Sequence, residues 1–283
     1  MPSTTIDRTR IGTFLGSLLA FWLFFEVATL LLEVSMLQLA PLYMFTPLLA
    51  AAITVIRSDV GIETLGVRLG RPRWLLVAAI LPLVLAVLAT GVAIAVPGIS
   101  FSPGAILLPG VQLPAGIAGA LATVGIVLVL GVTVNAALAV GEEVGWRGYL
   151  LWELAPLGFV RASIAIGTIW GLWHAPVIVE GYNYPSFPLL GVLVMTAATI
   201  TFAFVYTALV ARARSVLAAV FFHGVFNASG GLVLAWTQAE TAALSQLVAS
   251  PVGAASMVVF LAVAGLLVAR GAPDLERDRL FAE

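Results

Sequence analysis

The chain has 283 residues, of which 61% are hydrophobic and only 10% are charged. Soluble domains carry about 25% charged residues, so this composition excludes an ordinary soluble protein and indicates a polytopic membrane protein. The net charge of −1 and the lack of a basic block argue against nucleic-acid binding. Cysteine is absent, which excludes disulfides, thiolate metal sites and a cysteine nucleophile.

Eight apolar segments approach the length of about 20 residues that a transmembrane helix needs. We therefore predict an all-α polytopic membrane protein with about eight transmembrane helices, folded as one domain over residues 1–283. Only residues 271–283 have the polar composition of a soluble tail, which is compatible with disorder. The predicted spans are roughly Ile11–Leu32, Met36–Ile56, Trp74–Val96, Ala115–Val140, Ala162–Val179, Phe187–Val210, Val216–Trp236 and Leu247–Ala269.

The arginines predict the orientation of these spans. All 13 basic residues are arginine, and with eight spans they all fall on the side of the N-terminus or at its edge. The opposite connections contain only Glu33, Glu180 and Glu240 as charged residues. By the positive-inside rule, both termini are then cytoplasmic, and we expect a multi-pass protein of the plasma membrane.

The first candidate site residues end a long uncharged stretch from Trp74 to Gly141. Charges at the edge of lipid are costly, which makes Glu142 and Glu143 functional candidates. On a helix, Glu143 and Arg147 are four residues apart and can pair, while Glu142 faces elsewhere and is free to act as a general base. The alternative is that both glutamates merely end a helix at the water interface.

Both histidines of the chain also fall in apolar segments and have partners at helical spacing. Trp170 precedes His174 by four residues, so that the indole can pack on the imidazole and orient it. His223 and Asn227 share one helix face and can together form an oxyanion hole. For each histidine the alternative is a hydrogen bond between helices, as is common for polar residues in membranes.

The three motifs, taken in order along residues 141–227, resemble the CPBP family, the CAAX-protease and bacteriocin-processing (Abi) group that includes the type II CAAX prenyl endopeptidases. The family's second motif usually begins with Phe, where this chain has Trp170. The resemblance implies an intramembrane endopeptidase of about eight helices. In that interpretation Glu143, Arg147 and Trp170 are supporting residues.

The resemblance also implies catalytic roles. Glu142 activates water with the help of His174, and His223 and Asn227 stabilise the oxyanion. The family is described both as metalloproteases and as metal-free glutamate proteases. Either Glu142, His174 and His223 hold Zn²⁺, or no cofactor is used. Asn227 beside His223 favours the metal-free form slightly, because the pair is typical of an oxyanion hole and not of a ligand set.

The expected partners are membrane lipid and a peptide or protein substrate. This substrate can be hydrophobic or lipidated. The lysine-free composition indicates a GC-rich prokaryote and favours a leader-like peptide over a prenylated protein. Because Glu142 ends the fourth predicted span, we expect the site to open toward the cytoplasmic side. Two other functions stay open: a non-catalytic scaffold or immunity protein that binds a peptide or toxin, and, less favoured, a carrier that uses Glu26.

Overall fold

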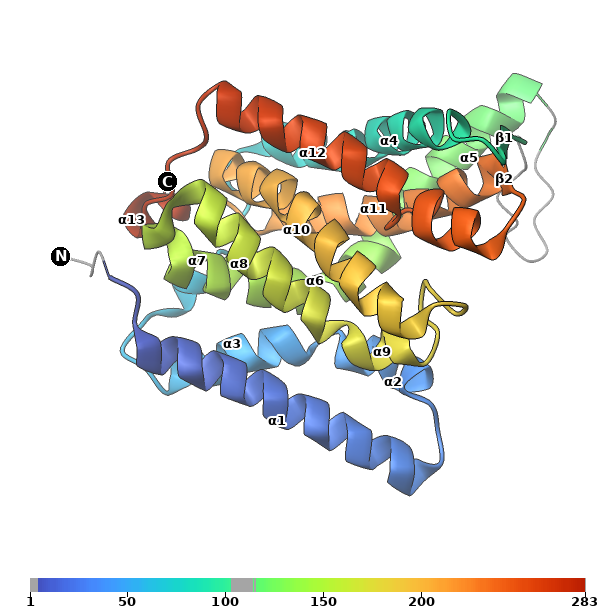
Figure 1. The fold of residues 1–283 in the computed structure, drawn as a ribbon. Coiled ribbons are helices and arrows are strands. Elements are labelled where there is room, and N and C mark those ends of the chain that lie inside the picture. The colour runs from blue at the N-terminus through green and yellow to red at the C-terminus, as the bar shows by residue number, and fades with distance from the viewer. Residues whose placement is uncertain (1–4, 103–113, 115, 283) are drawn as a thin grey trace.

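The computed structural model describes every residue except 1–4, 103–113, 115 and 283. It is a bundle of helices in which the N-terminal and C-terminal segments lie at the same end (Figure 1). The predicted all-α fold is confirmed. The only sheet among the described residues is a two-stranded antiparallel ribbon of β1 (Ile99–Phe101) and β2 (Thr237–Ala239), with Ser100 opposite Gln238.

The helices differ in length and continuity. The long uninterrupted ones are α1 (Arg8–Leu32), α4 (Pro72–Ile94), α10 (Pro188–Ala213) and α11 (Leu217–Trp236). A continuous helical stretch is formed by α5 (Gly116–Leu130), the π-helical η2 (Gly131–Asn135), α6 (Ala136–Glu143), the π-helical η3 (Val144–Leu150), α7 (Leu151–Leu154), η4 (Ala155–Leu157) and α8 (Gly158–Trp173). The short or isolated helices are α2 (Met36–Tyr43), α3 (Thr46–Ile56), η1 (Ile62–Leu65), α9 (Ala175–Val179), η5 (Leu244–Val248), α12 (Ala254–Ala269) and α13 (Arg277–Leu280).

Fewer helices meet the length and composition needed to span a membrane than the eight predicted. Among the described residues, five helices are long and apolar enough to cross a bilayer, or six if α2 and α3, bent by 43°, form one span. Two features explain the difference. The 57-residue stretch Ile117–Trp173 contains two predicted spans, which fold back on each other at Gly158 (φ 75°) (Figure 1). The last predicted span is represented by α12, which has only 16 residues. The protein is a multi-pass membrane protein.

Small residues bring the helices that carry the motifs close together. A Cβ on Gly145 would collide with Pro47 of α3, and one on Gly224 would collide with the backbone carbonyl of Gly131. Gly171 of α8 faces the backbone of Thr196 in α10 in the same way. Glycine is enriched at helix contacts in membranes because it permits such close backbone approach. These contacts pack η3 against α3, α11 against η2 and α8 against α10.

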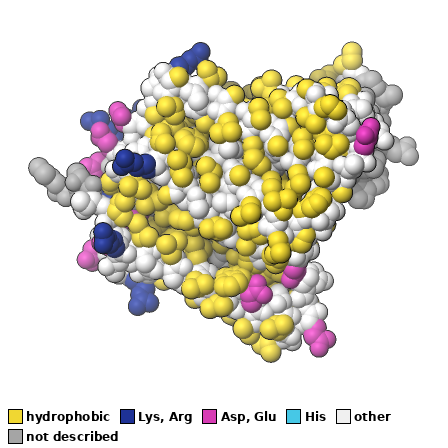
Figure 2. Space-filling model, viewed as in Figure 1, with side chains coloured by type: hydrophobic (Ala, Val, Ile, Leu, Met, Phe, Trp, Pro, Cys, Tyr) yellow, Lys and Arg dark blue, Asp and Glu magenta, His cyan; other side chains and the backbone are white. Residues whose placement is uncertain are grey.

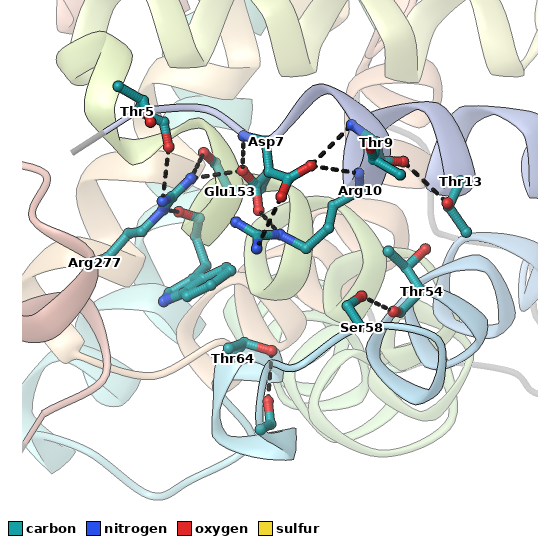
Figure 3. Close-up of polar contacts among 12 residues, drawn as sticks. Thr5, Asp7, Thr9, Arg10, Thr13, Thr54, Ser58, Thr64, Glu153 and Arg277 are labelled. Atoms are coloured by element: carbon teal, nitrogen blue, oxygen red, sulfur yellow. Dashed lines mark hydrogen bonds and ion pairs between the residues drawn. The ribbon is translucent and has the colours of Figure 1, made fainter. Parts of the chain in front are cut away.

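A buried carboxylate joins the two ends of the chain. Glu153 of α7 is fully buried and accepts from Arg10 Nε at 2.7 Å and from Arg277 Nη2 at 2.6 Å, as well as from the backbone N–H of Asp7 (Figure 3). Arg277 also donates to the carbonyl of Trp152 and stacks over its ring. Two guanidinium groups therefore neutralise one buried charge between the N-terminus, α7 and the tail.

This network corrects the expectation for the C-terminal tail. Residues 271–282 are not disordered: α13 is helical, and Leu275, Arg277 and Leu280 are buried. The polar composition indicated disorder because the partners that fix the tail, Glu153 above all, lie far away in the sequence.

The Asp7 side chain caps α1 in the same region. It accepts from the backbone N–H groups of Arg10 and Thr9. The hydrogen bond from Arg10 is the main reason that the pKa of Asp7 lies below its usual value. The cap is therefore charged at neutral pH, as favours a helix N-terminus.

We predict that Arg277→Ala releases the tail, because it leaves Glu153 with one cationic partner and removes three hydrogen bonds to backbone carbonyls. Hydrogen exchange of residues 272–282 in detergent should become fast. Arg279→Ala is the matched control, since that side chain is 72% exposed and pairs only with Glu276 within the described residues. Equal exchange in both variants would contradict the account.

Candidate active site

The predicted pair of Glu143 and Arg147 is present at the centre of the bundle. Arg147 Nη1 lies 3.0 Å from Oε1 and 3.2 Å from Oε2 of Glu143, and neither side chain is exposed. The helix changes from α to π directly after Glu143, but the spacing of four residues still brings the two groups together. Such π segments occur often at functional sites.

The Arg147 guanidinium is held between two aromatic rings. Its Cζ lies 4.1 Å from the ring centre of Trp170 and 4.3 Å from that of Tyr206. Both rings are buried, so the cation meets two π faces in a site removed from solvent. Tyr206 was missed by the sequence analysis, because it stands alone in an apolar segment with no motif partner at helical spacing.

Glu143 also binds the second histidine. His223 Nδ1 lies 2.7 Å from the same Oε1 atom that accepts from Arg147. A carboxylate paired with a guanidinium only accepts, so the Nδ1 atom carries the proton and donates it. The other ring nitrogen of His223, Nε2, is then left for the cavity described below. The sequence did not predict this contact, which joins residues 80 positions apart.

Glu142 has a partner other than Arg147 and is 2% exposed. Its Oε2 atom accepts a hydrogen bond of 2.6 Å from the indole N–H of Trp170. Trp170 also packs on His174, as the helical spacing predicted, with ring centres 5.8 Å apart. The hydrogen bond is an additional role, which a phenylalanine at this position lacks.

His174 lies at a break between helices. α8 ends at Trp173, and α9 begins with Pro176 in its first turn. His174 Nδ1 is 2.8 Å from the backbone carbonyl of Trp170. Since a carbonyl only accepts, Nδ1 donates and Nε2 is the free nitrogen.

One cavity collects the four predicted catalytic residues. It has a volume of about 450 Å³, and its lining includes Glu142, His174, His223 and Asn227. Asn227 lies one helical turn beyond His223 on α11 and, unlike the other three, is exposed. The remaining wall is mainly aromatic and aliphatic, with contributions from Tyr43, Trp170, Trp173, Val177, Met195, Phe202 and Phe226. A cavity with few polar groups in an apolar wall is typical of a binding site.

The position of this cavity along the bundle differs from the prediction. We expected Glu142 at the cytoplasmic end of its span. The helix instead continues to Leu154, about 18 Å further at about 1.5 Å per residue. The predicted span ended at Val140, where the charged motif begins, but the helix extends beyond it and these charges are buried inside the bundle. The side of the membrane to which the site opens stays a prediction.

The sequence left two possibilities for this site, a zinc ion held by Glu142, His174 and His223 or no cofactor. Among the described residues, no three His, Cys, Asp or Glu side chains are arranged to hold a metal ion. Glu142 is engaged by Trp170, and each histidine uses Nδ1 for another partner. The Nε2 atoms of both histidines and one oxygen of Glu142 remain available to the cavity, so the choice between zinc and no cofactor stays a prediction.

Comparison with known proteins finds a similar family over the region of the motifs. Residues 124–229 match the sequence model of the Type II CAAX prenyl endopeptidase Rce1-like family. The chain is similar to this family over that region. The family region covers less than half of the chain and includes every residue of the three motifs.

A curated member of this CAAX protease family is similar over a shorter stretch. The protein named CAAX prenyl protease 2 of Methanococcus maripaludis is 43% identical over 44 residues. That stretch covers 15% of this chain and 16% of the relative, so it spans about a sixth of the relative's length. Activity and substrate therefore have to be argued from the site itself.

We predict that Arg147→Met lowers the free energy of unfolding by about 3–5 kcal/mol, because it leaves Glu143 buried without its main counter-charge. The double variant Glu143→Gln/Arg147→Met should lose less than the sum of the two single variants, since it removes both charges. Denaturant unfolding in detergent micelles measures all three. Strict additivity would show that the pair is not coupled.

Proposed function

We propose that this chain is an intramembrane endopeptidase of the CAAX protease (CPBP) family and hydrolyses a peptide bond within the cavity. The observation that supports this most directly is the common cavity of Glu142, His174, His223 and Asn227, with the Glu142 carboxylate oriented by Trp170. The apolar wall suits a hydrophobic peptide segment, with or without a lipid group. Membrane lipid surrounds the exposed apolar helix faces (Figure 2).

In the first step, Glu142 acts as general base. One carboxylate oxygen is fixed by the Trp170 indole N–H, which leaves the other to accept a proton from water. The free Nε2 of His174 accepts the second hydrogen of the same water and orients it toward the peptide carbonyl. Loss of one proton to Glu142 gives a hydroxide that attacks the carbonyl carbon.

In the second step, the oxyanion is stabilised and the amine leaves. The Asn227 amide donates one hydrogen bond, and protonated His223 donates a second from Nε2. Glu143 accepts from His223 Nδ1 and so holds the ring with Nε2 available to the cavity. Glu142 then returns its proton to the departing nitrogen, and the C–N bond breaks.

The proposed reaction uses the side chains alone, and metal dependence stays a prediction. We expect purified active protein to contain far less than one zinc ion per chain by plasma mass spectrometry. Cleavage should persist after prolonged chelation. Stoichiometric zinc whose removal and return abolish and restore cleavage would contradict the metal-free mechanism.

The Glu142→Gln variant tests the catalytic role. Removal of a general base lowers the rate by about 10²–10⁴-fold, so cleavage of a mixed peptide library in proteoliposomes should be lost. Glu26→Gln is the matched control: Glu26 bonds to Trp22 on α1 and does not line the cavity. Unchanged cleavage by Glu142→Gln would refute this role, whereas no cleavage by the unsubstituted protein would favour the non-catalytic binding function.

A further inference from the structure

The arginine side chains and the cavity occupy opposite parts of the bundle. Every arginine except the buried Arg147 lies near the end that holds the two termini, in segments 8–10, 57–73, 161, 212–214 and 270–279 (Figures 1 and 2). By the positive-inside rule, this end faces the cytoplasm. The opposite end has Glu33, Glu180 and Glu240 as its charged residues.

Toward the arginine-rich end the cavity is closed. Three fully buried side chains lie between the catalytic residues and this end of the bundle: Arg147, Tyr206 and Phe222. Tyr206 packs on Phe222 with ring centres 4.7 Å apart. Further along, Tyr149 of η3 packs on Phe14 of α1 with ring centres 5.5 Å apart, and both side chains are fully buried.

Toward the arginine-free end the cavity is bordered by exposed residues. Leu37 at the start of α2 is 37% exposed, Tyr182 after α9 is 44% exposed, and Leu234 near the end of α11 is 51% exposed. These three residues belong to connections, or helix ends, that lie on the side of Glu33, Glu180 and Glu240. A hydrogen bond from the Leu37 N–H to Glu180 joins two sides of this mouth.

We propose, building on the endopeptidase function, that the cavity opens to the non-cytoplasmic side of the membrane. The substrate is then an apolar peptide segment presented from outside the cytoplasm, such as an exported peptide or an external part of a membrane protein. A tail that stays in the cytoplasm has no route to Glu142 through the closed end. The side of the membrane to which the cavity opens therefore determines which class of substrate can reach Glu142.

Single cysteines test this proposal, since the chain has none of its own. Tyr182→Cys reports on the mouth, and its backbone hydrogen bond to Val177 is unaffected by the side chain. Arg270→Cys reports on the opposite end. In sealed right-side-out membrane vesicles, a membrane-impermeant maleimide should label Tyr182→Cys at once and Arg270→Cys only after permeabilisation.

The reverse labelling pattern would overturn the proposal. Labelling of both positions in sealed vesicles would also overturn it, because it indicates that the protein inserts into the membrane in both orientations. If Tyr182→Cys does not fold, Leu37→Cys on the other side of the mouth replaces it. Labelling needs no peptidase activity, so this result stands even if the protein cleaves nothing. Failure of the proposed function is thereby separated from failure of the proposed opening.

A second measurement joins the opening to cleavage. External maleimide should block cleavage of an added peptide library by the Tyr182→Cys protein, compared with the same protein before labelling. Glu240→Cys is the control, since it lies at the same end but does not line the cavity. It should be labelled and cleave as before. Equal cleavage by the labelled Tyr182→Cys protein would show that substrate enters elsewhere.

Discussion

The buried charge of Arg147 is the constraint on which the rest of the site depends. A guanidinium with no exposed surface inside a membrane bundle requires a counter-charge and a polarisable environment. Glu143 supplies the first, and the rings of Trp170 and Tyr206 supply the second. Each of these partners comes from a different helix or helical segment, so the one cation fixes η3, α8 and α10 relative to each other.

The same partners then orient the groups proposed for catalysis. Glu143, held by Arg147, binds one nitrogen of His223 and leaves the other free. Trp170, stacked on Arg147, donates to Glu142, and its backbone carbonyl accepts from His174. A site preorganised in this way needs little rearrangement when charge develops during the reaction. Supporting and catalytic residues therefore form one connected unit around the arginine.

The sequence predicted the helical membrane fold, the family and the set of residues that share the cavity. Helical spacing was sufficient for Glu143 with Arg147 and for His223 with Asn227, because those relations are local. It could not predict the contact of His223 with Glu143 or the place of Tyr206, since these depend on how separate helices pack. The burial of Glu142 beyond the predicted span end and the docking of the tail by Glu153 were not predicted for a related reason. Buried charges resemble interfacial ones in a sequence, and only their partners distinguish them.

The most direct test of the central claim compares the single-turnover cleavage rates of Glu142→Asp and Glu142→Gln proteins of equal thermal stability. If a carboxylate at this position removes the proton from water, the aspartate variant should retain slow, measurable cleavage, and the glutamine variant should show none. Equal rates in the two variants would contradict the account, because the carboxylate would then have no part in the chemistry.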